Sequence, residues 1–164
     1  MSLVTSTATT VLIALGSNLG DSAAQILEAF DELQKLSTTP LRKSSLQQTA
    51  PMDCPPGSPL FVNAAVALTP LSGKTPESLL AKLQALEKHF GRQPKTVLNE
   101  ARPLDLDLIA FGVEVRNTPE LTLPHPRAHQ RRFVLQPLSE VAPAFVLPGQ
   151  TQTVAELLQA LGAA

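Results

Sequence analysis

The sequence predicts an α+β fold in which helices pack on a largely antiparallel sheet. Short apolar runs typical of strands alternate with segments of helical periodicity, in the order strand, helix, strand, strand, helix, strand. The chain has 164 residues, the size of one ordinary domain, and no repeat or linker-like stretch divides it. We therefore expect a short flexible tail over residues 1–10 and a single domain over residues 11–164.

Five segments are expected to be extended. The first and third are continuous apolar runs, the pattern of buried strands, whereas the second is only weakly patterned. The fourth alternates leucine with aspartate before an apolar run, and Gly112 is expected to turn it into a short hairpin with residues 113–115. The fifth is assigned as a strand from its apolar content. Their ranges are residues 11–15, 40–50, 61–68, 104–111 and 132–138.

Three helices are expected from their start signals and apolar stripes. Ser22 and Gln25 have the spacing of a capping box before the first stripe. Thr75–Pro76 offers a capping threonine and a proline at the first helical position of the second helix. Thr153 and Glu156 again have capping-box spacing, and they predict the last helix.

Composition excludes several classes of function. The formal net charge of −1 argues against a nucleic-acid-binding surface. The single Cys54 forms neither an internal disulfide nor a cysteine zinc site, which fits a reducing compartment. No apolar run approaches the length of a membrane span. These observations predict a cytoplasmic protein without nucleic-acid or membrane partners.

Asp105 and Asp107 are the most informative residues of the chain. They lie on the alternating strand, so both side chains point to the face opposite Leu104, Leu106 and Leu108. Two carboxylates on neighbouring positions of one face repel each other, and a divalent cation relieves that repulsion. Oxygen ligands with positions left for water and phosphate suit Mg²⁺. The pair therefore predicts a magnesium site.

Cationic residues flank this strand on both sides. Polyphosphate chemistry needs such a combination, because the metal bridges phosphate oxygens while guanidinium groups neutralise the transferring group. The upstream cations lie in residues 91–103, a polar stretch that we expect to be a long mobile loop. The flanking residues are Arg92, Lys95 and Arg102 upstream, and His125, Arg127, Arg131 and Arg132 downstream.

Taken together, several short motifs resemble those of the 6-hydroxymethyl-7,8-dihydropterin pyrophosphokinase family, over nearly the whole chain from Leu12 to about Leu161. The set is specific, whereas each motif alone is weak. The motifs that carry the resemblance are residues 14–20, 61–66, 91–92, 102–107, 123–125 and 131–138.

The resemblance implies an ATP-dependent diphosphotransferase of folate biosynthesis. Such an enzyme moves pyrophosphate from ATP to the hydroxymethyl group of a reduced pterin and releases AMP. The implied fold is a ferredoxin-like sandwich, and the implied enzyme is a monomer. Asp105 and Asp107 are implied to hold two Mg²⁺ ions. The implied catalytic residues are this pair together with Arg92 and Arg102, which belong to the loop that closes over the phosphates.

The resemblance also assigns residues to each substrate. A flat pterin suits a slot between two aromatic rings, and an Asn amide offers the donor and acceptor that a pterin edge requires. The implied pterin residues are Thr49, Pro51, Met52, Phe61, Asn63 and Phe133. The implied ATP residues are Gln84, Glu87, Lys95, Leu108, His125 and Arg131.

Four positions depart from the family pattern. Gln47 replaces a common tyrosine, and Ala50 replaces a common proline. Pro94 stands where a second loop arginine is common, and Asn99 stands where many members carry a tryptophan that covers the pterin. The metal pair, both phenylalanines and the principal cations are retained.

Two other classes of function remain open. A nucleotidyltransferase of the polymerase-β type also combines Gly-Ser with an Asp-x-Asp strand, although there the two elements lie close in sequence. A non-catalytic ferredoxin-like binding module is the second alternative, and it has no need of paired acids flanked by cations. The reaction product distinguishes the three classes: AMP is expected from pyrophosphoryl transfer, pyrophosphate from nucleotidyl transfer, and no turnover from a binding module.

Overall fold

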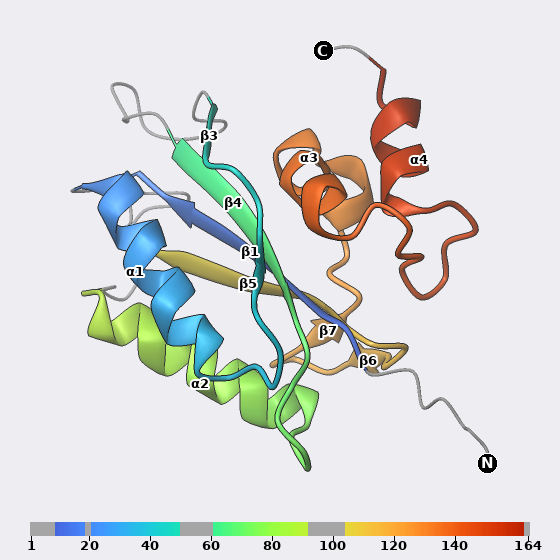
Figure 1. The fold of residues 1–164 in the computed structure, drawn as a ribbon. Coiled ribbons are helices and arrows are strands. Elements are labelled where there is room, and N and C mark those ends of the chain that lie inside the picture. Colours follow the sequence, from blue (N-terminus) through green and yellow to red (C-terminus); the bar gives the residue numbers. More distant parts are fainter. Residues whose placement is uncertain (1–8, 19–20, 50–60, 92–103, 163–164) are drawn as a thin grey trace.

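The structure is a computed structural model that describes residues 9–18, 21–49, 61–91 and 104–162 (Figure 1). Its strands are β1 (Val11–Ser17), β2 (Arg42–Lys43), β3 (Gln47–Thr49), β4 (Phe61–Leu68), β5 (Asp105–Phe111), β6 (Arg116–Asn117) and β7 (Thr122–Leu123). Its helices are α1 (Ser22–Gln34), α2 (Pro76–His89), α3 (Arg132–Val141) and α4 (Val154–Ala160), with a 3-10 turn, η1 (Ala128–Gln130), before α3.

The main sheet has the spatial order β2-β4-β1-β5, and β3 pairs with β4 on the same side as β2. All of these pairs are antiparallel. Between β2 and β3 the hydroxyl of Ser44 accepts a hydrogen bond from the N–H of Ala65 at 2.8 Å, so a side chain replaces a ladder carbonyl there. With β2 and β3 counted as one interrupted strand, this is the ferredoxin-like order, and the predicted α+β fold is confirmed.

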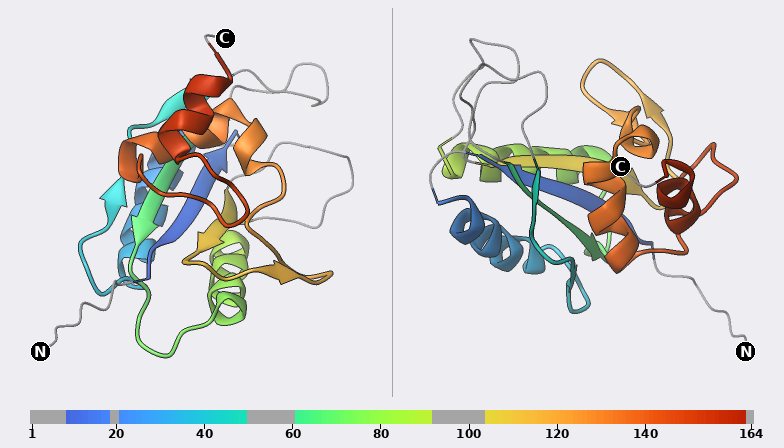
Figure 2. Two further views of the ribbon diagram at one scale, coloured as in Figure 1. Left: turned by 90° about the vertical axis from the view of Figure 1, so that its right-hand side faces the viewer. Right: turned by 90° about the horizontal axis from the view of Figure 1, so that it is seen from above.

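Helices cover both faces of the sheet. Figure 1 shows α1 and α2 on one side and α3 with α4 on the other, and Figure 2 shows the same layers from two further directions. The α1/α2 face buries large side chains such as Ile13, Leu15 and Val66. The strands give mostly small side chains to the α3/α4 face, among them Ala14 and Ala65. Small residues let α3 approach the sheet closely.

The edge strand β5 carries a β-bulge. The register between β1 and β5 shifts between Leu12 and Ile13, which makes Ile109 the extra residue. The carbonyl of Ile109 accepts a hydrogen bond from the N–H of His125 at 2.9 Å. The bulge therefore ties the segment after β7 to the strand that carries the two aspartates.

The predicted starts of α2 and α4 are confirmed, with a threonine cap and a capping box at each. The predicted capping box of Ser22 and Gln25 is wrong. Asp21 is the N-cap of α1 instead, and its Oδ1 accepts a hydrogen bond from the N–H of Ala24 at 3.2 Å. An aspartate one residue earlier satisfies the same orphan N–H groups.

The strand expected over residues 132–138 is also wrong, because the chain forms α3 there. The buried residues of this segment recur at helical spacing, and they cover the second face of the sheet. Burial of that stripe outweighs Pro137 inside the helix. The buried residues are Val134, Leu135, Pro137, Leu138 and Val141.

The expected hairpin between β5 and residues 113–115 does not form. Gly112 begins a turn with a φ of +58°, but the hairpin partners are β6 and β7. Arg116 anchors that hairpin to α2, since its Nε donates a hydrogen bond to Glu77 at 2.6 Å. Its Nη1 donates a second hydrogen bond to Glu114, in the segment before β6, at 2.8 Å. Within the described part of the chain, none of the helices has the length and apolar character needed to cross a membrane.

Candidate active site

A row of four residues crosses the sheet at the end where β1 finishes and β4 and β5 begin. The register pairs Gln47 with Asn63, Asn63 with Gly16, and Gly16 with Asp105. Paired residues point to the same face, and the alternate residues of β4 that share this face lie in the core beneath α3. Two strand spacings separate Asn63 from Asp105, about 10 Å. The fold thus brings a predicted pterin residue and a predicted metal ligand onto one surface.

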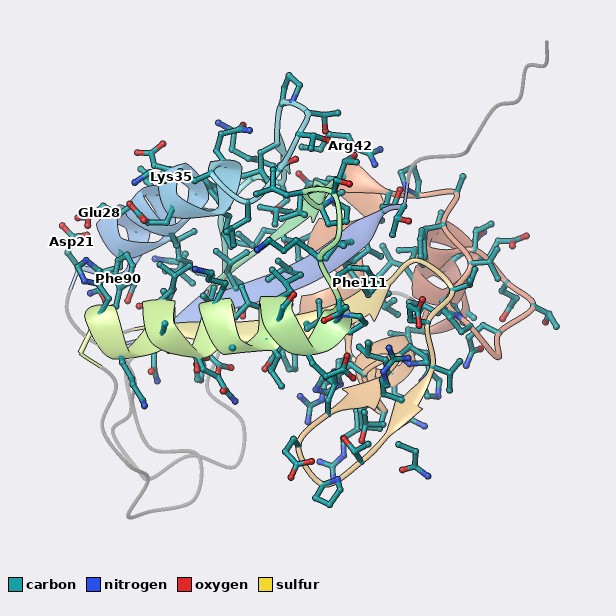
Figure 3. The ribbon with its side chains drawn as sticks, turned by 90° about the horizontal axis from the view of Figure 1, so that it is seen from below. Asp21, Glu28, Lys35, Arg42, Phe90 and Phe111 are labelled. Carbon is teal, nitrogen blue, oxygen red and sulfur yellow. The ribbon has the colours of Figure 1, made fainter. Side chains whose placement is uncertain are left out.

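Figure 3 identifies this end of the molecule. Phe90, at the end of α2, and Asp21, at the start of α1, lie toward one end, and Phe111 marks the opposite end of β5. Asp105 begins β5, so the row lies at the end marked by Phe90 and Asp21.

Gly16 forms the middle of the row and has no side chain to fill it. A Cβ at this position would lie 3.4 Å from Oδ1 of Asn63 and 3.9 Å from Cδ1 of Phe61, which are ordinary contacts. The φ of Gly16 also lies outside the left-handed region that favours glycine. Neither backbone conformation nor packing therefore requires glycine here, and a glycine inside a strand often marks close approach of a ligand.

Asp105 and Asp107 are both half-buried on this face, and the register places Asp107 opposite Ala14. In the described residues, no group of three or more histidine, cysteine, aspartate or glutamate side chains is placed to hold a metal. Mg²⁺ is commonly bound through one or two carboxylates, with waters and substrate phosphates completing its shell. The donor set at this position fits that ion.

Glu87 holds the backbone between the two aspartates. Its Oε2 accepts a hydrogen bond from the N–H of Leu106 at 2.7 Å, across the open edge of β5. Gln84 lies one turn earlier on α2 and is exposed. The side chain of Leu108 is buried in the α1/α2 core, so only its backbone can face a nucleotide.

His125 is half-buried near Asp105, between the charges of Arg127 and Arg131. Burial lowers the pKa of His125 below its ordinary value of 6.5, the positive charges of Arg131 and Arg127 lower it further, and Asp105 acts in the opposite direction. Nδ1 of the ring accepts the N–H of Arg127 at 3.3 Å. The neutral ring therefore carries its proton on Nε2, which can donate to a phosphate oxygen.

The start of α3 supplies the opposite wall. Cζ of Arg131 lies 5.5 Å from the centroid of the Phe133 ring, a cation–π contact. Phe133 is partly buried against the α3/α4 core, which covers the face that also bears Phe61 and Asn63. The two predicted aromatic residues thus lie on two layers that pack against each other.

Several predicted site residues lie outside the described residues. Thr49 is described in its backbone, which pairs with Phe61. The predicted site residues that fall outside are Pro51, Met52, Arg92, Lys95 and Arg102.

The sequence analysis gave no role in the site to four polar residues of this region. Ser17 and Asn18 are 0% and 1% exposed at the end of β1. Polar residues at the end of an apolar strand are a signal that could have found both. Nε2 of Gln47 donates a hydrogen bond to Oε2 of Glu140, which lies 93 positions later in the sequence, so only the tertiary structure reveals this contact.

Comparison with known proteins gives a consistent picture. The model of the 7,8-dihydro-6-hydroxymethylpterin-pyrophosphokinase family matches residues 12–143. The 2-amino-4-hydroxy-6-hydroxymethyldihydropteridine pyrophosphokinase of Haemophilus influenzae is 39% identical over 152 residues, which are 92% of this chain and 91% of that protein. The protein of the same name from Pseudomonas aeruginosa is 39% identical over 84% of this chain and 83% of its own length.

Larger proteins match as well. The chain is 36% identical to the folic acid synthesis protein fol1 of Pneumocystis carinii but spans only 18% of it. The crystal structure of wild-type Plasmodium falciparum HPPK-DHPS with pteroate has a TM-score of 0.71 at 14% identity. That match covers 96% of this chain and 43% of the Plasmodium chain, and it supports the fold.

Proposed function

The chain belongs to the 7,8-dihydro-6-hydroxymethylpterin-pyrophosphokinase family, and on this premise we propose that it transfers pyrophosphate from ATP to 6-hydroxymethyl-7,8-dihydropterin in folate synthesis. The products are the pterin diphosphate and AMP. One observation carries the proposal: the row that sets Asn63 and Asp105 on one surface, with the side-chain-free Gly16 between them. An acceptor held at Asn63 and a polyphosphate held at Asp105 then meet over Gly16.

The pterin lies between Phe61 on the sheet and Phe133 on α3. Stacking on two ring faces suits a flat heteroaromatic molecule, and the amide of Asn63 pairs with its polar edge. Asn63 is 6% exposed, and a buried amide that matches a substrate edge discriminates against rings that lack the pattern. Thr49, Pro51 and Met52 complete the same subsite.

ATP occupies the other side of the row. Nε2 of His125 and the guanidinium of Arg131 face the triphosphate as a neutral donor and a fixed positive charge. Gln84, Glu87 and the backbone of Leu108 line the edge of β5 on the nucleotide side. Lys95, Arg92 and Arg102 add positive charge, and both arginines act on the charge that develops as the pyrophosphoryl group moves.

Asp105 and Asp107 would hold Mg²⁺, two ions in this proposal. Bound there, Mg²⁺ would neutralise phosphate charge and help to orient the triphosphate. The protein's own contribution is to align the groups, so that the pterin hydroxyl oxygen attacks the β-phosphorus while the bond to the α-phosphate oxygen breaks. AMP leaves and one proton is released.

We further propose that the chain acts as a cytoplasmic monomer with small-molecule partners only. The single Cys54 supports a reducing compartment, and the balanced charge supports the absence of a nucleic-acid partner.

Product identification tests the function. With ATP, Mg²⁺ and the reduced hydroxymethylpterin, we expect AMP and the pterin diphosphate. Asp105→Asn and Asp107→Asn should each lower kcat by about 10²-fold or more, because each removes a carboxylate that would hold the metal against the phosphates. Asp31→Asn, on the exposed side of α1, is the matched control and should be neutral. Pyrophosphate as product would favour a nucleotidyltransferase, and no turnover would favour a binding module.

A further inference from the structure

Glu140 joins two parts of the chain that are far apart in sequence. Its Oε1 accepts the N–H of Ser45 at 2.8 Å, and its Oε2 accepts the Ser45 hydroxyl at 3.0 Å. The same Oε2 accepts Nε2 of Gln47 at 2.7 Å. One carboxylate of α3 thus accepts three hydrogen bonds from the first residue of β3 and the segment before it.

The position of Glu140 is unfavourable for the helix itself. It is the next-to-last residue of α3, and a carboxylate close to a helix C-terminus opposes the helix dipole. Helix stability therefore does not account for a glutamate here. The three hydrogen-bond donors offset the unfavourable position of the carboxylate in the helix dipole. This indicates that the role of Glu140 is its contact with Ser45 and Gln47.

The contact links the two walls of the proposed pterin slot. Glu140 follows Phe133 by seven residues, two helical turns or about 10 Å, so both residues lie on the same face of α3. Gln47 is the cross-strand partner of Asn63. The carboxylate therefore ties the strand beside Asn63 to the helix that bears Phe133.

We propose that Glu140 is a positioning residue for the pterin, which sets the spacing between the sheet wall of Phe61 and Asn63 and the helix wall of Phe133. This inference rests on the proposed function. A ring between two aromatic faces needs about 7 Å, since carbon atoms attract best at about 3.5–4.0 Å. Widening the gap by only about 0.5–1 Å forfeits a quarter to a half of that attraction.

The predicted signature is selective. Glu140→Ala releases β3 from α3 and should raise the KM for the pterin about tenfold, which corresponds to about 1.4 kcal/mol. The KM for MgATP should stay within about twofold, because the contact holds no residue of the proposed nucleotide side. Gln47→Ala should act in the same direction, and adding it to Glu140→Ala should cost little more, since the pair acts as a unit.

The experiment measures both KM values, kcat and the thermal midpoint for these variants. Glu114→Ala is the matched control, because it removes an exposed carboxylate that accepts a hydrogen bond from Arg116 of β6. It should leave both KM values unchanged. The double variant Gln47→Glu with Glu140→Gln again pairs a donor amide with an acceptor carboxylate, with the two roles exchanged. Its pterin KM should return most of the way to the wild-type value. A role in stability alone would instead lower the thermal midpoint without a selective rise of the pterin KM.

Two results would overturn the positioning role. One is an unchanged pterin KM in both Glu140→Ala and Gln47→Ala. The other is an equal rise of both KM values together with a lower thermal midpoint, which would indicate general loosening of the fold. Failure of the proposed function is a different result, because then the wild-type protein itself forms no AMP.

Discussion

We expect Gly16→Ala to leave the fold intact and to impair pyrophosphate transfer. Gly16 lies between Asn63 and Asp105 in the row that crosses the sheet. An added methyl group meets Oδ1 of Asn63 at 3.4 Å and Cδ1 of Phe61 at 3.9 Å, so the protein alone accommodates it. The same methyl group occupies the surface over which the two substrates are proposed to meet.

The two effects have opposite signs. Alanine is more favourable than glycine inside a strand by about 0.5–1 kcal/mol, so the free energy of unfolding should stay equal or rise. A reacting group displaced by about 1 Å can lose about 10²-fold in rate. We therefore expect kcat/KM to fall by about that factor while the thermal midpoint does not decrease.

The assay is AMP formation with both substrates, together with a thermal melt. Gly73→Ala is the matched control, because Gly73 has a φ of +80° and a Cβ there would meet no atom within 4 Å. A left-handed alanine costs about 1–2 kcal/mol, so this variant should lose stability and keep its activity. Full activity in Gly16→Ala, or a large loss of stability in that variant, would refute the reasoning about this surface.

Three further outcomes follow from the site. Phe133→Ala should weaken pterin binding by about tenfold and ATP binding much less, since stacking on one ring face is worth about 0.5–1.5 kcal/mol. Calorimetry with each ligand measures both affinities. Equal losses of affinity for the two ligands would indicate that Phe133 has a purely structural role. The pKa of His125 is lowered in the folded protein, so the unfolded chain binds more protons just below pH 6.5. Stability should therefore fall as the pH drops from about 6.5 toward the folded pKa, and His125→Gln should flatten this part of the unfolding profile. Glu87→Ala removes the carboxylate that accepts the N–H of Leu106, at a cost of about 1–3 kcal/mol, and it should raise the Mg²⁺ concentration needed for half-maximal activity. Glu87→Gln retains an acceptor, so its Mg²⁺ requirement should lie between those of the wild type and the alanine variant. An unchanged Mg²⁺ requirement in the alanine variant would contradict the proposed role.

The strand that carries the aspartates was predictable because its signal is local. Leucine and aspartate alternate with the period of a strand, and one buried face is enough to fix which residues turn inward. Asp105 and Asp107 consequently share a face in the structure as the sequence indicated. The threonine caps of α2 and α4 are equally local, since each involves residues three apart.

Helix α3 was not predictable in the same way. Its first seven residues are apolar enough to fit a strand, and Pro137 argues against a helix interior. The helix forms because the second face of the sheet needs a cover, a requirement set by strands far away in sequence. The contacts of Glu140 with Ser45 and Gln47 depend on that same packing, so sequence spacing gave no sign of them.

The positions of the sheet that depart from apolar packing at the proposed site lie on its α3/α4 face. The α1/α2 face buries large apolar side chains, whereas the α3/α4 face, at the end of β1, carries Gly16 and the buried polar side chain of Asn63. A sheet built for stability alone would carry apolar side chains at such positions, because burying an amide costs free energy unless it is well paired. Local departures of this kind are expected where a site must leave room for a ligand and match its polar edge. Filling Gly16 with alanine should then keep or raise the stability of the fold while lowering activity, the opposite of what substitutions in the α1/α2 core would do.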